Sequence, residues 1–275
     1  MLKKLVLLFS MIGFISAVGL LNLAQAASYG GNQFISAPDS SGQLGLFFSE
    51  TAQTPRINHG NFALDADWQN FQTGGNGVTV TDNAIPIFAT ADLGVAQDVE
   101  VNLALNYEFN FFSDNFNVPI NSINGLDDLL GGVKVRIPSE NRLLNFAVLG
   151  KLFYGPLSSS LGNGAVGFDI DGVTTYILKN NILLNGEFGI TYQGGANGSA
   201  SSTFVQLKLG TGIPLQRSLN GIAEFSINEY GTNGSIFDIG LRGGNNQLVY
   251  EGVIGLGLAS NAPGIIVGGS VIFPL

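Results

Sequence analysis

The chain of 275 residues is 45% hydrophobic and only 11% charged, and it has a net charge of −9, a single histidine and no cysteine. Soluble domains contain about 25% charged residues, so a chain this poor in charge is difficult to keep dispersed in water. The acidic balance argues against a nucleic-acid partner, and the lack of cysteine excludes disulfides, thiolate metal sites and cysteine nucleophiles.

The N-terminus carries the three parts of a secretory signal peptide. Lys3 and Lys4 precede an apolar run over residues 5–21, and an A-x-A sequence ends at Ala26. This order predicts export and cleavage after Ala26, so residues 1–26 are assigned to a signal peptide. The alternative, a retained membrane anchor, is disfavoured because small and polar residues interrupt the run.

The rest of the chain begins with a Gly-, Ser- and Asn-rich stretch, residues 27–42, which we expect to form a flexible leader. From residue 43 onwards, apolar and polar side chains alternate in segments of roughly 8 to 13 residues, the pattern of strands with one apolar face. Residues 99–111 are the clearest case, with Val, Leu, Tyr or Phe at every odd position. The segments are 43–51, 61–68, 84–94, 99–111, 129–138, 142–154, 165–176, 182–192, 203–214, 221–230, 236–243, 247–259 and 264–273.

The connections between these segments differ in length in a regular way. Residues 95–98 and 139–141 are short turns, whereas long loops follow Phe111, Tyr154 and Tyr192. Short turns at one end and long loops at the other are typical of outer-membrane barrels, and aromatic residues near strand ends match their interfacial girdles. The sequence therefore predicts an all-β fold, an antiparallel up-and-down transmembrane β-barrel whose apolar face meets lipid.

The strand count depends on which early segment belongs to the barrel. Single-chain bacterial barrels usually have an even number of strands, so one segment of the set lies elsewhere. Either residues 43–51 or residues 61–68 supply the first strand, and the other segment belongs to a loop or a plug. We favour residues 43–51, which gives about twelve strands and a barrel over residues 43–275.

Two stretches resemble a known family. ADLGVAQDVEVNLALNY (residues 91–107) has a strand, short turn, strand pattern, and NGLDDLLGGVKVRI (residues 124–137) is similar to a Gly-x-Gly-Asp strand start with Asp127 in place of the second Gly. Both resemble the outer-membrane transporters of the meta-pathway of phenol degradation, which are distant kin of long-chain fatty-acid transporters. The resemblance covers most of the mature chain as a layout and implies a barrel. The chain departs from the pattern at its end, where Pro274 and Leu275 follow the last aromatic residue.

The polar faces of the strands hold the charged residues, which alternation directs towards the barrel interior. They form either a salt-bridge network that fills the lumen or the lining of a conducting channel, and both alternatives stay open. We expect Glu100 to pair with Arg136, and Glu187 with Lys208. The candidate lumen-lining residues are Glu100, Asn102, Asn106, Glu108, Lys134, Arg136, Lys151, Asp169, Asp171, Glu187, Lys208, Glu224, Asp238, Arg242 and Glu251. Together with Asp92, this set contains nine acids and five bases, so an open pore is expected to prefer cations.

The long loop after Phe111 is unusually apolar for a loop that faces water. It is expected to fold into the lumen as a constriction, to capture an apolar molecule, or to pack on itself. The residues of this loop-constriction hypothesis are Phe112, Phe116, Val118, Ile120 and Ile123.

Residues suited to catalysis or metal binding are scarce. His59 lies in a predicted loop and no G-x-S-x-G sequence accompanies it, so a hydrolytic triad is disfavoured. Asp127 and Asp128 supply oxygen ligands of the kind that Ca²⁺ takes, but two acids beside a strand start are more often a turn feature. We therefore expect neither an enzyme nor a cofactor.

These features predict an outer-membrane channel or transporter that passes or binds a small, hydrophobic molecule. The alternative is a structural or surface-interaction barrel with an occluded, salt-bridged lumen. The expected partners are outer-membrane lipid, the barrel-assembly machinery and a small-molecule cargo, with no nucleic acid.

Overall fold

The structure, a computed structural model, describes residues 37–38, 44–46, 49–75, 78–114, 119–141, 143–155, 164–178, 180–195, 201–227, 234–245, 247–259 and 262–275. The predicted signal peptide and nearly all of the predicted leader lie outside these residues. Within them the regular elements are β-strands, and no helix is long and apolar enough to cross a membrane. The strands are β1 (Ala37–Pro38), β2 (Leu44–Gly45), β3 (Gly60–Gly75), β4 (Val78–Ala96), β5 (Val99–Asp114), β6 (Pro119–Ile137), β7 (Leu144–Tyr154), β8 (Val166–Ile177), β9 (Leu183–Gln193), β10 (Ser202–Gln216), β11 (Leu219–Ile227), β12 (Ser235–Gly244), β13 (Val249–Gly257) and β14 (Ile265–Pro274).

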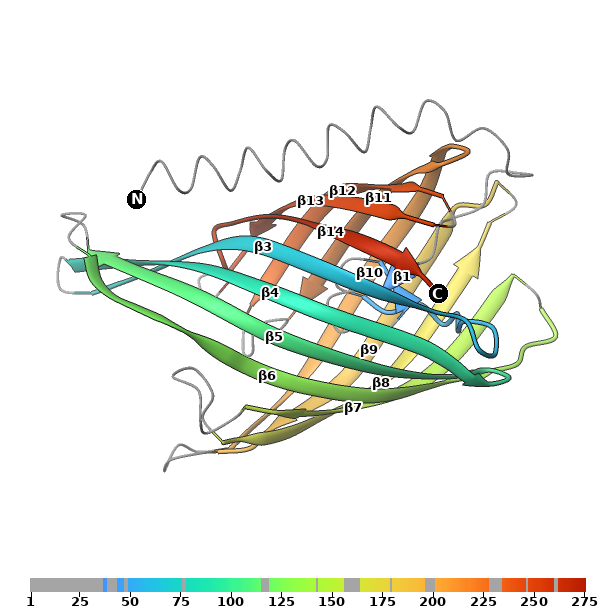
Figure 1. Ribbon diagram of the computed structural model, residues 1–275, viewed down its shortest axis with the longest axis horizontal. Helices are drawn as coiled ribbons and strands as arrows, with labels where there is room; N and C mark the ends of the chain where they lie inside the picture. The colour runs from blue at the N-terminus through green and yellow to red at the C-terminus, as the bar shows by residue number, and fades with distance from the viewer. Residues whose placement is uncertain are drawn as a thin grey trace.

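Strands β3 to β14 form one closed barrel, and β1 pairs only with β2 in a small separate sheet (Figure 1). Each barrel strand pairs antiparallel with the next along the chain, and β14 returns to pair with β3. Closure removes the unpaired strand edges, which the hydrocarbon of a membrane does not tolerate. The predicted all-β, up-and-down barrel of twelve strands is thus confirmed.

The first strand of the barrel is not the segment that we favoured. Residues 61–68 lie in β3, which pairs with β14 from Asn61 through Asn70. Residues 43–51 contribute only the two-residue β2 and no barrel strand. Two consecutive Phe residues at positions 47 and 48 break the alternation of this segment, whereas alternation in β3 continues past residue 68. The preference for residues 43–51 was therefore wrong.

Burial alternates with a period of two along the barrel strands. In β8 and β9 nearly every second residue is buried and most of the residues between are exposed. The exposed side is apolar, with Leu103 at 69% and Leu152 at 64% exposure, whereas Glu100 and Lys134 are fully buried. An apolar outer surface around a charged interior is the arrangement of a lipid-embedded barrel.

Aromatic rings pair on the outer face near the strand ends. The ring centroids of Phe62 and Phe273 lie 6.4 Å apart at the short-turn end of β3 and β14, and those of Phe168 and Tyr192 lie 5.2 Å apart at the long-loop end of β8 and β9. Rings at these two levels match the girdles that barrels place at the membrane interfaces.

Strands β3 to β6 are much longer than the others. They contain 16 to 19 residues, against 9 to 15 in β7 to β14. A membrane strand needs only about 9–11 residues. The excess projects away from the end of the barrel at which the C-terminus lies (Figure 1).

This extension corrects the apolar loop predicted after Phe111. Strand β5 continues to Asp114 and β6 begins at Pro119, so most of the predicted loop is paired strand. The pairing persists because the neighbouring β4 is equally extended and pairs with β5 as far as Asp114.

Candidate functional site

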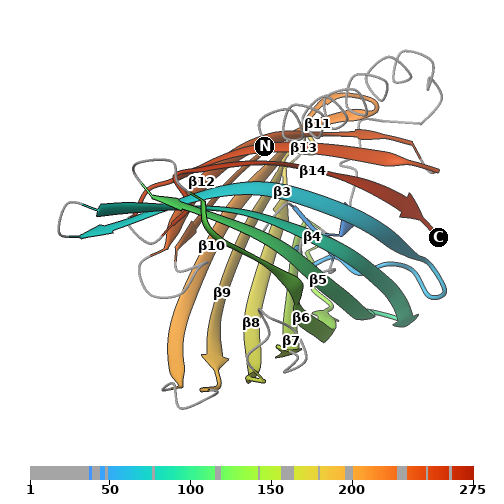
Figure 2. The ribbon, with the colours of Figure 1, turned by 60° about the vertical axis from the view of Figure 1, so that its left-hand side comes forward.

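A short segment that precedes β3 lies inside the barrel. Its described residues, Leu46, Ser49, Glu50, Thr51 and Ala52, are at most 1% exposed, and we call them the plug segment. Figure 2 shows this blue part of the chain on the inner side of the curved wall. The plug segment belongs to the region for which the sequence left open a strand or a plug.

Side chains of the wall satisfy the backbone of the plug segment. Three of its N–H groups donate to wall residues on β11, β9 and β8. These bonds join Ser49 N to Glu224 Oε1 (3.1 Å), Glu50 N to Glu187 Oε2 (2.9 Å) and Ala52 N to Thr175 Oγ1 (2.8 Å). Buried backbone groups need partners, and here wall side chains replace the ladder that a strand would have supplied.

Two carbonyl groups of the plug segment are satisfied in the same way. Asn185 Nδ2 donates to the carbonyl oxygen of Glu50 over 2.6 Å, and Arg242 Nη2 donates to that of Leu46 over 2.8 Å. Arg242 also pairs with Glu251 on β13, so its guanidinium is held between the wall and the plug segment. The plug segment is therefore attached to the wall through both its N–H and its carbonyl groups.

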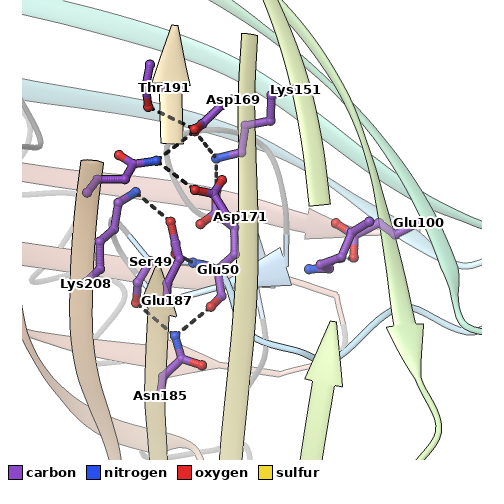
Figure 3. Close-up of polar contacts among 12 residues, drawn as sticks. Ser49, Glu50, Glu100, Lys151, Asp169, Asp171, Asn185, Glu187, Thr191 and Lys208 are labelled. Atoms are coloured by element: carbon purple, nitrogen blue, oxygen red, sulfur yellow. Dashed lines mark hydrogen bonds and ion pairs between the residues drawn. The ribbon is translucent and has the colours of Figure 1, made fainter. Parts of the chain in front are cut away.

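Charge holds the middle of the plug segment. Glu50 forms an ion pair with Lys151 of β7. Glu187 accepts a hydrogen bond from Glu50 N and forms an ion pair with Lys208, whose Nζ lies 3.3 Å from Glu187 Oε1 (Figure 3). Burial alone would raise the pKa of Glu50, but the positive charges of Lys151 and Lys208 hold it well below its ordinary value of 4.5. The Glu50 carboxylate is therefore ionised at neutral pH and attracted to the wall.

The two ends of the plug segment are apolar. Leu46 belongs to a buried cluster with Leu183, Ile222 and Ile236, and Ala52 belongs to one with Leu149. Burying such side chains stabilises the docked position by about 25 cal/mol per Å² of apolar area.

A glycine in the wall makes room for the plug segment. A Cβ atom at Gly210 of β10 would lie 2.4 Å from Leu46 Cδ1 and 3.3 Å from Ser49 Oγ. A side chain at this position would compete with the plug segment for the same space.

The structure places most candidate lumen residues inside the wall. The buried ones are Glu100, Asn102, Asn106, Lys134, Lys151, Asp169, Asp171, Glu187, Lys208, Glu224, Asp238, Arg242 and Glu251. Glu108 is half-buried, and the Arg136 side chain is 37% exposed at the short-turn end.

Of the two predicted ion pairs, Glu187 with Lys208 is present, whereas the prediction that Glu100 pairs with Arg136 was wrong. Lys208 and Glu187 are cross-strand partners and lie 3.3 Å apart. Glu100 pairs with Lys134 at 2.9 Å, because the register of β5 and β6 sets these two residues opposite each other. Arg136 lies further along β6 and pairs with Asp98 of the turn instead.

The loop-constriction residues are divided by the structure. Phe112 lies in β5 and Ile123 in β6, both half-buried and on the strand faces that carry Asn110 and its neighbours. The side chains of Phe116, Val118 and Ile120 lie outside the described residues.

Several site residues have no place in the sequence prediction. Asn185 and Thr175 follow the same two-residue period as Glu187 and Asp171, so that period could have identified them. Glu50 carries no such signal, because its role depends on a segment that is not part of the wall. Asp82 was missed because its strand, β4, begins earlier than the predicted segment 84–94, and Asp67 was missed because residues 61–68 were assigned to a loop or a plug.

Neither an enzymatic nor a metal centre is evident in the described part of the chain. His59 is exposed just before β3, and no group of three or more His, Asp or Glu side chains among these residues is arranged to hold a metal ion.

Comparison with known proteins places this chain by fold. No protein-family model and no curated protein matches the sequence. The COG4313 outer membrane channel from Pseudomonas putida F1 is similar in structure, with a TM-score of 0.65 and 8% identity over 82% of this chain and 98% of that chain. The toluene transporter TbuX from Ralstonia pickettii gives a TM-score of 0.42 and 5% identity over 87% of this chain and 94% of that chain. At this identity the likeness to the Pseudomonas channel shows a shared barrel fold.

Proposed function

We propose that the protein is an outer-membrane channel for a small, hydrophobic molecule and that the plug segment closes it. The observation that carries this proposal is that a separate segment occupies the interior and is bound there by wall side chains. A barrel whose only task is structural can fill its lumen with wall side chains alone, as Glu100 and Lys134 do. A removable closure suits a channel that opens.

The attachment of the plug segment favours movement about one end. Between it and β3, Asn58 N donates to the carbonyl of Gly94 over 2.8 Å, and Gly94 N donates to that of His59 over 2.9 Å. Ile57 also forms a parallel bridge with Gly94. These contacts fix the C-terminal side of the plug segment to the short-turn end of β4, so opening consists of releasing Leu46 through Ala52 around this anchor.

Location in the outer membrane is supported by the apolar outer face, the predicted signal peptide and the likeness to a solved outer-membrane channel. The expected mature N-terminus is residue 27. Mass spectrometry of protein from purified outer membranes tests this, and a chain that keeps Lys3 and Lys4 in the inner membrane contradicts it.

A reversible cross-link tests the closure directly. The chain contains no cysteine, so Ser49→Cys with Gly210→Cys introduces the only two thiols. The 3.3 Å between Ser49 Oγ and a Cβ at position 210 is compatible with a disulfide between these positions. We expect uptake of a radiolabelled small aromatic hydrocarbon by Gram-negative cells to stop on oxidation and to return on reduction.

The single variants Ser49→Cys and Gly210→Cys are the controls. Gly210→Cys crowds Leu46 and should raise uptake by itself, but neither single variant should respond to oxidation. Uptake that persists through the locked plug would show that the plug segment is not the closure. The second candidate, a structural barrel with an occluded lumen, is favoured by the complete burial of the plug segment. It predicts no uptake above that of cells lacking the protein, whether the cross-link is oxidised or reduced.

A further inference from the structure

The long-loop half of the barrel contains a second polar cluster that the plug segment does not reach. Its members are Asp82 of β4, Asn106, Glu108 and Asn110 of β5, and Asp127 and Asp128 of β6. Asn106 donates to Asp127 over 3.1 Å, and Asn110 donates to Glu108. The charges that act on Glu108 come from Asp127, Asp82 and Asp128, and all are negative.

A β-bulge creates this cluster. Leu105 pairs with Leu129 and Tyr107 with Leu126, so Asp127 and Asp128 together oppose the single residue Asn106. Strict alternation would send one of the two carboxylates outwards, whereas a bulge re-aims side chains. Gly125 lies opposite Glu108, so β6 provides no side chain directly across from this carboxylate.

Unpartnered acceptors point to a missing donor. Asn106 is 9% exposed and Asn110 is 6% exposed, and the Oδ1 atom of each accepts no hydrogen bond from the described part of the chain. Their amide orientation is fixed, because each Nδ2 faces a carboxylate that only a donor can approach. The buried Oδ1 atoms of Asn106 and Asn110 therefore lie in a cluster that also contains four carboxylates. Asp82 Oδ1 is likewise buried and has no hydrogen-bond partner in the described part of the chain. Such a group of acceptors calls for a ligand that brings N–H donors and positive charge.

Apolar side chains flank the acceptors. Ile123 is the cross-strand partner of Asn110, and Phe112 is that of Asp82. Both are half-buried, as are Glu108, Asp127 and Asp128, so solvent reaches the cluster while the two amides form its buried floor. Because no three acids here are arranged as ligands of a metal ion, the cluster suits an organic cation better than a bare metal.

We propose that this cluster binds a small organic cation, with its ammonium group on the Asn106, Asn110, Glu108 and Asp127 acceptors and its apolar body against Phe112 and Ile123. The site goes beyond the proposed channel function, because it adds organic cations with an apolar body to the hydrophobic molecules proposed as cargo, and its role in passage rests on that function. Binding itself does not depend on passage, so the two can fail separately.

The test uses the full-length mature protein in a non-ionic detergent and isothermal titration calorimetry at constant ionic strength. Phenethylammonium is the probe, and phenethyl alcohol and phenylacetate are its neutral and anionic counterparts. We expect one saturable site for the ammonium and at least about tenfold weaker binding of the alcohol and of the anion. Equal binding of all three would overturn the proposal.

Matched variants locate the site. Asp82→Asn and Asp92→Asn make the same change on the inner face of one strand, ten residues or about 33 Å apart. Glu108→Gln and Asp82→Asn should weaken binding of phenethylammonium about tenfold, while Asp92→Asn should leave it within about twofold. Equal losses in Asp82→Asn and Asp92→Asn would show a diffuse field rather than a site.

Asn110→Asp is a variant for which we expect tighter binding, because it adds a carboxylate next to the ammonium group. Tighter binding cannot result from misfolding, so this variant controls for losses of binding that misfolding causes. Weaker binding in this variant, with the folded heat-modifiable band intact, would contradict the assignment. Stoichiometric Ca²⁺ binding without binding of the ammonium would also overturn it. If the wild-type protein binds phenethylammonium but gives no hydrocarbon uptake above that of cells lacking it, the result would count against the channel function alone.

Discussion

Glu50 of the plug segment forms an ion pair with Lys151 of the barrel wall, although the two residues are 101 positions apart in the chain. The pair links a segment that precedes the barrel to β7, on the part of the wall that also carries Asp169. Both side chains are at least 95% buried. Removing one partner of a buried pair leaves an uncompensated charge, which costs roughly 3–5 kcal/mol.

This pair predicts the effect of neutralising the plug segment. Glu50→Gln keeps the side-chain shape and the Glu50 N–H bond to Glu187, but it removes the closer of the two carboxylates that pair with Lys151 and leaves Asp169 at 4.0 Å. We expect a folded barrel whose open probability in planar bilayers is raised several-fold. Glu50→Gln combined with Lys151→Met removes both charges and should open less than Glu50→Gln alone. A closed Glu50→Gln channel would show that the ion pair does not hold the plug segment.

The same pair predicts how closure depends on pH. The pKa of Glu50 in the docked state is below its ordinary value of 4.5, so docking favours the ionised form. Its contribution is therefore complete above about pH 4.5 and is lost only as the pH falls through the lower, docked value. Conductance of the wild-type channel should stay low from neutral pH down to about 4.5 and rise below it.

The Glu50→Gln variant is the control, because it has no carboxylate to titrate at this position. Its conductance should change less than that of the wild type over the same acidic range. A wild-type channel that opens between pH 7 and 5 would contradict a lowered pKa at Glu50.

Gly210 predicts a steric way to open the channel. A methyl group at this position would lie 2.4 Å from Leu46 Cδ1, so Gly210→Ala forces the end of the plug segment to shift. We expect increased conductance and faster proteolysis near residue 46 without loss of the folded barrel. Gly252→Ala on β13 is the control, since a Cβ there meets nothing within 4 Å. Equal behaviour of the two variants would mean that Leu46 moves aside without loosening the plug segment.

The two faces of β5 supply a further prediction. Leu103 is 69% exposed on the outer face, and its neighbour Asn102 is 3% exposed on the inner face. A charge at the middle of a barrel's lipid face costs about 2–4 kcal/mol, so Leu103→Arg should reduce the heat-modifiable folded fraction strongly. Asn102→Arg places the charge opposite Asp92 and should fold better. Equal loss of folded protein would mean that the outer face does not meet lipid.

The residues on the inner face of the wall were predictable from the sequence because side chains along a strand alternate between its two faces with a fixed period of two. Once residues such as Glu187 and Lys208 fall on the inner parity of neighbouring strands, antiparallel pairing brings them together. The same reasoning failed for Glu100. The identity of its partner depends on the register between β5 and β6, which composition does not reveal. Lys134 and Arg136 share one face of β6, and a shift of two residues decides between them.

The plug segment and the bulge were beyond the reach of that reasoning for different physical reasons. Ser49 and Glu50 are bound by side chains far along the chain, and no local period marks such contacts. Asp127 and Asp128 are adjacent, so alternation sends them to opposite faces, and only the bulge opposite Asn106 brings both to the polar cluster. Neighbouring strands likewise extended β5 beyond Phe111, where the sequence alone indicated a loop.

The charge of the interior predicts the ionic preference of the opened channel. Asp67 and Asp82 add to the acids on the inner face, while the buried bases Lys134, Lys151, Lys208 and Arg242 each have an acidic partner. A channel that lacks residues 44–52 should therefore prefer cations, as a reversal potential under a salt gradient would show. The preference for cations should weaken as salt rises, because the Debye length falls from about 10 Å at 0.1 M to about 3 Å at 1 M.

Glu108→Gln is the informative variant, because the charges that act on Glu108 are all acidic and its removal leaves no buried base without its acid. It should lower the cation preference, whereas Glu140→Gln at an exposed short turn should not. Anion preference in the plug-free channel would contradict an acidic lining.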